Sequence, residues 1–410
     1  MVRPEVSDMG LRIVADENIP YIEEAFSGMG SVRLLSGRAM TAEAVKGADI
    51  LLVRSVTKVD EKLLAGSQVK YVGTATIGTD HVDCGWLAKN GIGFAAAPGS
   101  NANSVAEYMT AALLVLARDG NFQLQGKTIG VVGVGNVGSL VVAKAKALGM
   151  KVLMNDPPRA EDKNDPDRGK FITLDEMLKA EVDVITLHVP LEKGGKYPTW
   201  HLANQDFFGR LKTGAIFFNT CRGGVHETGA LHRAIDAGRL GGVVLDTWEG
   251  EPRIDVGLLE KVEIGTPHIA GYSFDGKVEG TRMIYRAACK HFGKTPTWEA
   301  KLPAAPRAHL VIEANPLTCP AGRGTSSPSR ERGIEDVLRE AVLTVYDIEG
   351  DDARMRGLIG LGAEEAGKGF DRLRKEYPVR REFYNTEVEL RGGDVRTAET
   401  LRGLGFKVRK

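Results

Sequence analysis

An arginine, a glutamate and a histidine follow one another at the ends of short apolar runs in the second half of the chain. Arg222 lies in Asn219-Thr-Cys-Arg-Gly-Gly-Val, Glu251 in Asp246-Thr-Trp-Glu-Gly-Glu-Pro, and His268 in Gly265-Thr-Pro-His-Ile-Ala-Gly. Histidine exchanges protons near neutral pH, and a carboxylate beside it orients the ring and stabilises its protonated form. A guanidinium grips a carboxylate through two parallel hydrogen bonds. These groups suit removal of a hydroxyl proton from a substrate carboxylic acid while a hydride leaves the same carbon.

Each of these residues has an ordinary alternative explanation. Arg222 alone would be a surface ion-pair partner, Glu251 a turn residue and His268 a loop histidine. Glu249 competes equally with Glu251 for the carboxylate role, and His188, at another strand end, is a rival base. Their order behind a dinucleotide-binding motif makes the catalytic interpretation the favoured one.

That motif is the stretch 127–138, which reads as a strand, a glycine turn and the start of a helix predicted over 140–148. Gly133, Gly135 and Gly138 have the G-x-G-x-x-G spacing, with Asn136 and Val137 between the last two. The first glycine permits the turn, the second lets the backbone approach a pyrophosphate, and the third lets helix and strand pack closely. The N–H groups at the helix start favour a bound phosphate.

An acidic residue stands where the adenine ribose is expected. The strand 151–156 ends at Asp156, which lies 156 − 138 = 18 residues beyond the last glycine. A carboxylate there bonds the ribose hydroxyls and repels a 2′-phosphate, so the sequence predicts NAD rather than NADP. Arg159, close by, keeps the second cofactor as an alternative.

Further apolar runs end in polar residues, at 183–188, 214–219, 241–246 and 262–268. In an open parallel sheet, ligands bind outside the carboxyl ends of the strands. We therefore expect one group of polar residues to converge there: Asp156, Thr186, His188, Thr220, Cys221, Arg222, Asp246 and His268.

The first hundred residues also alternate strands and helices. Strands are predicted at 11–15, 32–35, 50–53, 69–76 and 92–95, and helices at 21–27 and 42–47. Continuous apolar strands separated by helices indicate a parallel sheet covered on both faces. A long helix over 103–118, capped by Asn103 or Ser104, connects to the dinucleotide-binding domain.

Three domains are predicted. Residues 11–102 and 276–296 form a substrate-binding domain, joined through a helix over 278–291. Residues 103–275 form the NAD-binding domain, and 297–410 a C-terminal α+β domain with a Pro- and Gly-rich linker at 303–333. In the C-terminal domain we expect helices at 333–346, 370–377 and 397–404 and a strand at 386–390.

Composition excludes several classes of protein. Acidic and basic residues balance at 54 each, which gives no sign of a nucleic-acid or membrane-surface partner. The four cysteines, Cys84, Cys221, Cys289 and Cys319, are scattered and indicate neither a metal site nor disulfides. No apolar run reaches the ~20 residues of a membrane span, and the N-terminus lacks a signal-peptide pattern, so a cytoplasmic location is expected, with Met9 as an alternative start.

Residues 11 to about 295 resemble the D-2-hydroxyacid dehydrogenase family, which uses an Arg, a Glu and a His in this chain order. The resemblance is narrower, toward a branch acting on a phosphorylated 2-hydroxy acid, in five motifs: 15–20 (Ala-Asp-Glu-Asn-Ile-Pro), 52–58 (Leu-Val-Arg-Ser-Val-Thr-Lys), 72–83, 248–252 and 268–272. It implies a flavodoxin-like substrate domain and a Rossmann NAD domain. Arg222 would orient the substrate carboxylate and His268 would be the acid/base, with Glu251 as its partner.

The resemblance also implies binding roles. Ser55, Thr76 and Tyr272 would contact the substrate, and Arg54, or secondly Lys58, is our candidate for its phosphate. NAD would contact Asp156, Thr186, Asp246, Gly271 and the turn Thr220-Cys221-Arg222. The C-terminal domain is similar to the family's dimerisation domain, clearest at 371–377 and 380–382, and implies a homodimer.

The expected activity is therefore NAD-dependent oxidation of a phosphorylated 2-hydroxy acid. Two alternatives stay open: another dehydrogenase of the family, for glycerate, phosphoglycerate or lactate-type substrates, and an NAD-sensing binding protein without turnover. One departure from the family is His226, which stands where an apolar residue is usual.

Overall fold

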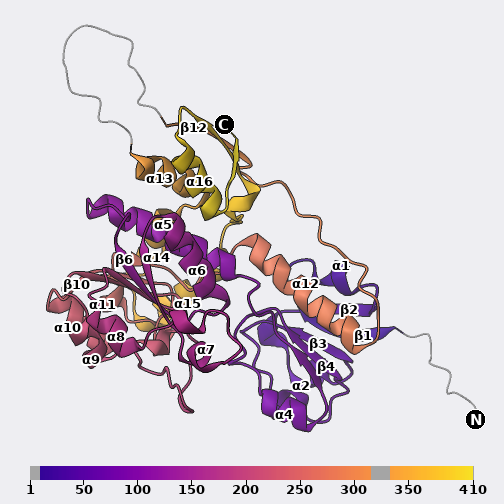
Figure 1. The fold of residues 1–410 in the computed structure, drawn as a ribbon. Coiled ribbons are helices and arrows are strands. Elements are labelled where there is room, and N and C mark those ends of the chain that lie inside the picture. The colour runs from indigo at the N-terminus through magenta and orange to yellow at the C-terminus, as the bar shows by residue number, and fades with distance from the viewer. Residues whose placement is uncertain (1–9, 315–332, 410) are drawn as a thin grey trace, which may run out of the picture. The chain divides into compact units, whose positions relative to one another are not determined.

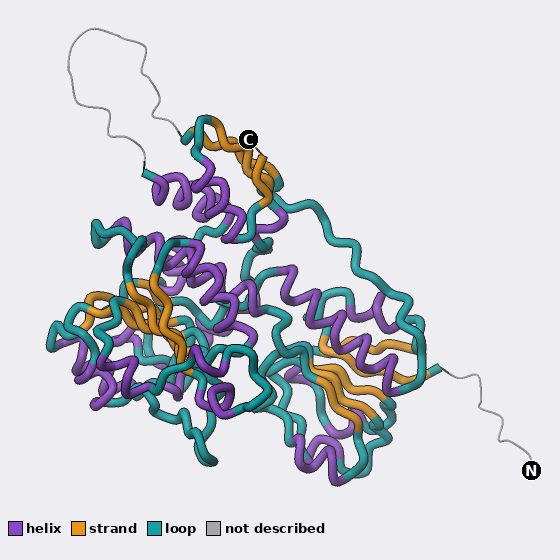
Figure 2. Tube along the Cα trace, viewed as in Figure 1, coloured by secondary structure: helices purple, strands orange, loops and turns teal. Residues whose placement is uncertain are grey.

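The computed structural model describes residues 10–314 and 333–409 and divides into two compact units. The first contains residues up to Asn101 together with Phe274–Pro303; the second contains Ala102–Ser273 together with the chain from Ala304. In each unit the strands form an inner layer with helices beside it (Figure 2). The boundaries of the three predicted domains stay a prediction.

The first unit is a five-stranded parallel sheet in the order β2-β1-β3-β4-β5, which is the flavodoxin-like order. Its strands are β1 (Leu11–Asp16), β2 (Gly30–Leu35), β3 (Ile50–Val53), β4 (Tyr71–Thr74) and β5 (Gly93–Ala95). Its helices are α1 (Ile22–Phe26), α2 (Ala42–Val45), α3 (Glu61–Leu64), α4 (Cys84–Lys89) and α12 (Phe274–His291), with a 3₁₀ turn at Gly37–Ala39. The fold predicted for this part is confirmed.

The second unit contains a six-stranded parallel sheet in the order β11-β10-β9-β8-β6-β7. Its strands β6 and β10 are labelled in Figure 1. The strands are β6 (Thr128–Val132), β7 (Lys151–Asn155), β8 (Val184–Leu187), β9 (Ala215–Asn219), β10 (Leu240–Leu245) and β11 (Ile264–Gly265). The helices are α5 (Ala102–Asp119), α6 (Asn136–Ala147), α7 (Pro157–Glu161), α8 (Leu174–Lys179), α9 (Gln205–Arg210), α10 (Thr228–Asp236) and α11 (Val256–Leu259), with 3₁₀ turns at Arg168–Lys170 and Gly223–Val225. The strand order reverses at β6, which is where a doubly wound sheet binds its ligand.

Three expectations for this sheet are corrected. The helix after the glycine turn begins at Asn136 rather than at 140, and the strand predicted over 262–268 is only Ile264–Gly265. The long helix begins at Ala102, so neither Asn103 nor Ser104 caps it. Their side chains instead bond to carboxylates: Asn103 Nδ2 donates to Glu107 Oε1 at 3.0 Å, and Ser104 Oγ to Glu382 Oε1 at 2.8 Å.

The C-terminal part of the second unit adds a three-stranded parallel sheet, in the order β12-β13-β14. Its strands are β12 (His309–Glu313), β13 (Glu387–Arg391) and β14 (Lys407–Arg409); its helices are α13 (Ile334–Val345), α14 (Ile348–Arg356), α15 (Ala363–Lys375) and α16 (Val395–Leu404), with a 3₁₀ turn at Phe383–Asn385. The prediction of a linker at 303–333 was wrong at 309–313, because these residues form β12 and pair with β13. Residues 315–332 of that linker lie outside the described residues.

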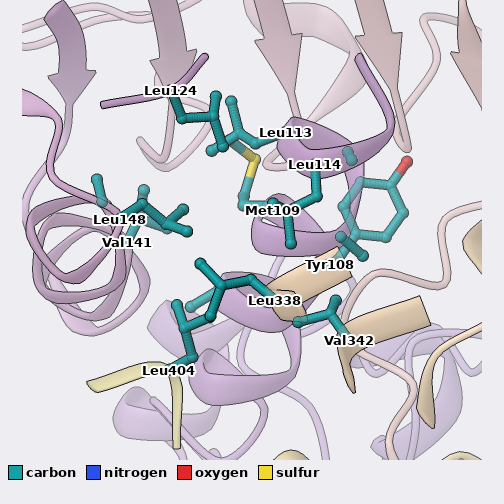
Figure 3. Packing of buried hydrophobic residues seen from close by; sticks show 14 of the residues in the cluster. Tyr108, Met109, Leu113, Leu114, Leu124, Val141, Leu148, Leu338, Val342 and Leu404 are labelled. Atoms are coloured by element: carbon teal, nitrogen blue, oxygen red, sulfur yellow. The ribbon is translucent and has the colours of Figure 1, made fainter. Parts of the chain in front are cut away.

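The C-terminal helices complete the core on one side of the large sheet. Figure 3 shows side chains of α5, α6, α13 and α16 gathered in one buried cluster, with Leu338 and Val342 on α13 and Leu404 on α16. Gly403 on α16 comes so near α6 that a Cβ there would lie 2.7 Å from the Ala147 Cβ. Helices α13 and α16 therefore share one core with the glycine-turn helix α6.

A buried ionic cluster fastens the C-terminal segment to α5. Glu107 Oε1 accepts the Phe383 backbone N–H at 2.8 Å, and its Oε2 lies 3.8 Å from Arg380 Nη1. Glu382 Oε1 accepts from the Ser104 and Ser273 hydroxyls at 2.8 and 2.7 Å. Burial, and secondly the negative charge of Glu382, raise the pKa of Glu107 to about 8, against the opposing charges of Lys144 and Arg380.

This cluster makes stability depend on pH. The pKa of Glu107 is raised on folding from 4.5 to about 8, so the folded chain binds more protons between these values, and wild-type stability falls as pH rises through that window. Glu107→Gln removes this loss while its amide oxygen can still accept from Phe383. Relative to wild type, we expect the variant to gain about 1 kcal/mol or more between about pH 5 and about pH 8 in denaturant unfolding. Glu364→Gln, at a side chain that is 76% exposed, is the control. If Glu107→Gln and wild type differed in unfolding free energy by the same amount at about pH 5 and about pH 8, the raised pKa of Glu107 would be contradicted.

Candidate active site

The glycine turn has the geometry that each glycine was expected to provide. Gly133 has φ = +85°, and a Cβ there would lie 2.6 Å from the His188 carbonyl oxygen. A Cβ on Gly138 would lie 2.0 Å from the Gly133 carbonyl oxygen, so helix and turn pack closely. A Cβ on Gly135 would meet nothing within 4 Å. The backbone at Gly135 is thus open to a pyrophosphate, and the first N–H groups of α6, which have no acceptor within a helix, favour bound phosphate.

Asp156 follows β7 and is hydrogen-bonded to the glycine turn. Its Oδ2 accepts the Val134 backbone N–H at 2.8 Å, and its Oδ1 caps α7 by accepting the Arg159 N–H at 3.1 Å. Arg159 is held by Asp165, with its Nε 2.6 Å from Oδ2, and also donates to the Val134 carbonyl at 2.7 Å. Because Arg159 is already paired with an acid, it is poorly placed to neutralise a 2′-phosphate. The residues present therefore fit NAD.

His188 is a poor candidate for the base. Its Nε2 lies 3.0 Å from the Thr186 hydroxyl, and its Nδ1 lies 3.5 Å from that of Thr220. Burial lowers the pKa of His188 to about 3, so the ring stays neutral and takes up a proton only with difficulty. These three side chains instead line the ends of β8 and β9.

A buried asparagine that sequence reasoning assigned no role organises the turn carrying Arg222. Asn219 Oδ1 accepts the Cys221 N–H at 3.0 Å, and its Nδ2 donates to the Arg222 carbonyl at 2.9 Å and to His226 Nδ1 at 2.9 Å. His226 is therefore neutral with its proton on Nε2, and burial lowers its pKa to about 4. Its place in the run, where an apolar residue is usual, is explained by this bond. Burial also raises the pKa of the Cys221 thiol to about 11.

A glycine brings the Arg222 turn against the turn that contains Glu251. A Cβ on Gly223 would lie 2.1 Å from the carbonyl carbon of Trp248, so only a glycine allows the two turns to touch. Trp248 is itself buried, and its Nε1 donates to the Thr266 carbonyl at 2.9 Å. The turns carrying all three predicted catalytic residues are therefore joined through Trp248.

Asp246, at the end of β10, shapes the loop that carries His268. Its Oδ1 accepts from the Thr266 hydroxyl and the Ile269 N–H, both at 2.7 Å, and its Oδ2 from the Ala270 N–H at 3.0 Å. Burial raises the pKa of Asp246 above its usual value. Its bonds to the chain hold the loop in shape, whereas the NAD contact expected for Asp246 stays a prediction.

Glu251 and His268 form a close pair. His268 Nδ1 lies 2.5 Å from Glu251 Oε1, while Glu251 Oε2 accepts the Trp248 N–H at 3.2 Å. His268 has φ = +58°, a conformation uncommon for a side-chain-bearing residue, and its side chain is 27% exposed. Burial would raise the pKa of Glu251, but His268, and after it Arg374, lower it overall. The carboxylate thus fixes Nδ1 and leaves Nε2 to exchange a proton.

The alternative carboxylate has another partner. Glu249 Oε1 lies 2.6 Å from His201 Nε2, and its Oε2 accepts the Thr228 N–H at 3.2 Å. Hydrogen bonding to these groups outweighs burial and lowers the pKa of Glu249. Geometry therefore favours Glu251 over Glu249 as the partner of His268.

The substrate residues predicted in the first unit lie at adjacent strand ends. Val53 pairs with Thr74 in the sheet, so Ser55 and Thr76 lie the same distance beyond neighbouring strands. The Thr76 hydroxyl donates to the Gly78 carbonyl at 3.0 Å. Arg54 Nε lies 3.3 Å from the buried Asp16 carboxylate.

Lys58, the second phosphate candidate, is 80% exposed and pairs with Asp60 at 3.1 Å. The roles of Ser55, Thr76, Arg54 and Lys58 stay predictions. So do those of Tyr272, Gly271 and the turn 220–222 in the second unit.

Two absences concern the described residues, 10–314 and 333–409. Within them, no cluster of His, Cys, Asp or Glu could hold a metal ion. Nor does any helix in this part of the chain have the length and apolarity of a membrane span.

Comparison with known proteins places this geometry in a family. Residues 111–270 match the family model described as D-isomer specific 2-hydroxyacid dehydrogenase, NAD binding domain, and residues 327–405 match Domain of unknown function (DUF3410). Among solved structures, the chain is 28% identical to D-lactate dehydrogenase from Aquifex aeolicus complexed with NAD and lactic acid; the match covers 69% of this chain and 96% of that one, with a TM-score of 0.56. For cofactor(NAD+)-bound 3-phosphoglycerate dehydrogenase from Entamoeba histolytica, the identity is 25%, the coverage 69% and 96%, and the TM-score 0.59.

The class is thus that of the NAD-dependent D-2-hydroxyacid dehydrogenases, with an Arg222–Glu251–His268 set on the NAD-binding unit. A curated relative, erythronate-4-phosphate dehydrogenase from Klebsiella pneumoniae (strain 342), is 44% identical over 97% of this chain and 98% of its own length. The chain belongs to the erythronate-4-phosphate dehydrogenase family.

The two glutamates give a matched pair of variants. We expect Glu251→Gln to lower kcat for hydroxy-acid oxidation about tenfold or more, because the protonated imidazole loses its counter-charge. Glu249→Gln removes a carboxylate two residues away that bonds His201, and we expect near wild-type turnover. Steady-state NADH formation measures both, and equal losses in the two variants would contradict the pairing.

Proposed function

We propose that the chain oxidises 4-phospho-D-erythronate at C2 with NAD+, giving (R)-3-hydroxy-2-oxo-4-phosphooxybutanoate, as a step in pyridoxal 5′-phosphate biosynthesis. The observation that carries this proposal is the Glu251–His268 pair, 2.5 Å apart, in a chain 44% identical to relatives with that activity in their name.

The residues have distinct parts in the reaction. His268 takes the C2 hydroxyl proton on Nε2 as the C2–H bond breaks and the C2–O bond becomes a carbonyl. NAD+, when bound, supplies the acceptor for the hydride. Glu251 stabilises the imidazolium through Nδ1, and Arg222 orients the substrate carboxylate. In the reverse direction His268 returns the same proton to the carbonyl oxygen.

The proposal also covers the location of the enzyme in the cell and its oligomeric state. No membrane-spanning helix occurs among the described residues, and we propose that the enzyme works in the cytoplasm. From the family resemblance of residues 297–410 we further propose a homodimer formed through that part of the chain, which light scattering of the purified protein would detect.

The test is NADH formation by purified protein with NAD+ and a panel of acids: 4-phosphoerythronate, glycerate, 3-phosphoglycerate and lactate. A 2-oxo acid is added in a parallel series to reoxidise any NADH that stays bound. We expect turnover on 4-phosphoerythronate alone. His268→Ala should lower kcat about 10²- to 10⁴-fold, and Arg222→Ala should lower kcat/KM by a comparable factor.

The matched control is His232→Ala. His232 also pairs with a carboxylate, Asp255, at 2.9 Å, but lies on α10 and belongs to no predicted site, so its loss should leave turnover unchanged. Turnover confined to glycerate, 3-phosphoglycerate or lactate would overturn the substrate assignment and keep the dehydrogenase. NADH binding without turnover on any acid would favour the NAD-sensing protein.

A further inference from the structure

The C-terminal segment, part of the match to a domain of unknown function, packs against the turn and the loop that carry Glu251 and His268. On α15, a Cβ at Gly367 would lie 3.4 Å from the Pro252 carbonyl oxygen and 3.4 Å from Arg253 Cγ, so this helix backs onto the residues that follow Glu251. One turn further, Phe370 is buried in the core that also contains Trp248. Helix α15 therefore packs against Pro252 and Arg253, which follow Glu251 in the sequence, and shares a core with Trp248, which precedes it.

The last turn of α15 places Arg374 at the loop carrying His268. Its guanidinium carbon lies 5.7 Å from the centre of the Tyr272 ring and 5.9 Å from that of Phe370. Its Nε is buried and meets no hydrogen-bond acceptor among the described residues. A cation so placed is costly unless nearby negative charge compensates for lost hydration.

Such charge comes from the catalytic pair and its support. Although burial disfavours the charged form, interactions with Tyr272, Glu251 and Asp246 raise the pKa of Arg374 above its usual value, and one of them is a side-chain hydrogen bond with Tyr272. Conversely, Arg374 is among the groups that lower the pKa of Glu251, after His268. Arg374 and Glu251 therefore interact, although one belongs to the C-terminal segment and the other to the NAD-binding sheet.

We propose that Arg374 is a positioning residue for the acid–base pair: its guanidinium holds the Tyr272 side chain beside the loop, and its positive charge opposes uptake of a proton by the Glu251–His268 pair before the reaction, so that His268 is free to accept the substrate proton. The inference rests on the proposed function and assigns a part in it to the C-terminal segment. It does not require Arg374 to touch the substrate.

Other ionisable side chains act on the Glu251–His268 pair besides Arg374. Asp246 at the end of β10 acts electrostatically on His268, and Arg374 on α15 acts on Glu251, with Tyr272 next to Arg374. Arg380 also reaches this loop, but through a 2.8 Å hydrogen bond to the Ala270 carbonyl, and its charge faces Glu107. Arg374 is thus the cation to vary.

The variant is Arg374→Met, which keeps the length of the side chain and removes its charge. Without this cation the Glu251–His268 pair holds its protons more tightly, so the acid limb of the kcat/KM profile for oxidation should move to higher pH by about half a unit or more. Below that limb kcat/KM should fall several-fold, with KM changing less than kcat. Arg374→Lys keeps the charge and should keep the limb.

Arg372→Met is the matched control, because Arg372 lies on the same helix but is exposed. We expect it to retain both the wild-type limb and kcat. An unmoved limb in Arg374→Met would overturn the proposal, and so would a loss confined to KM, which would mean that Arg374 acts on substrate binding, directly or through Tyr272, and not on the acid–base pair.

A second measurement needs no substrate. The Glu251 carboxylate is followed by carbon-13 NMR against pH in the NAD+-bound protein, and its titration midpoint should move upward in Arg374→Met only, because Arg374 lowers the pKa of Glu251. If the wild type oxidises none of the acids, the proposed function fails, yet this midpoint still decides the role of Arg374. If Arg374→Met does not fold, Arg374→Gln takes its place in the same titration, and an unmoved midpoint in any folded neutral variant overturns the proposal.

Discussion

The geometry of the loop that carries His268 depends on the buried carboxylate of Asp246. It accepts three hydrogen bonds, from the Thr266 hydroxyl and from the Ile269 and Ala270 N–H groups. These bonds turn the chain sharply after β11 and hold His268 in its left-handed conformation. Since a residue with a Cβ adopts that conformation only when its surroundings compensate the cost, Asp246 and the Glu251 contact together maintain it. Asp246, which the sequence predicts as an NAD contact, therefore holds the shape of this loop.

Around that loop, the site is built from backbone contacts that only particular residues permit. Gly223 lets the Arg222 turn touch Trp248, and Gly133 lets the cofactor turn approach the end of β8. Asn219 satisfies the polar groups of the turn that ends in Arg222. The two glycine contacts each join one strand end to that of its neighbour, so the predicted functional side chains follow the order of the parallel sheet.

Much of this organisation could be predicted from the sequence, and the remainder could not for physical reasons. The glycine spacing and the apolar runs that stop at polar residues are local signals. They located the NAD-binding domain, which the family model confirms, and they singled out Arg222, Glu251 and His268, whose catalytic roles stay predictions. Deciding whether Glu251 or Glu249 pairs with His268 required the structure, because two carboxylates two residues apart cannot be told apart in the sequence. The structure shows that Glu249 pairs with His201 instead. Likewise, the weak base character of His188 comes from burial alone, and β12 was missed because a short strand in a Pro-rich stretch is recognised only by its pairing with β13.

The shared core of α5, α6, α13 and α16 has a consequence for how the protein is made. The strands of the NAD-binding sheet are complete once Gly265 has been synthesised, but the helices that cover α5 and α6 are encoded only at 334–345 and 395–404. During translation, apolar side chains of α5 and α6, such as Leu113 and Val141, therefore remain exposed to solvent until α13 and α16 have been synthesised. Nascent chains at this stage expose the kind of surface that chaperones bind, and a message truncated before α16 would yield a protein with an intact cofactor turn and a persistent tendency to aggregate.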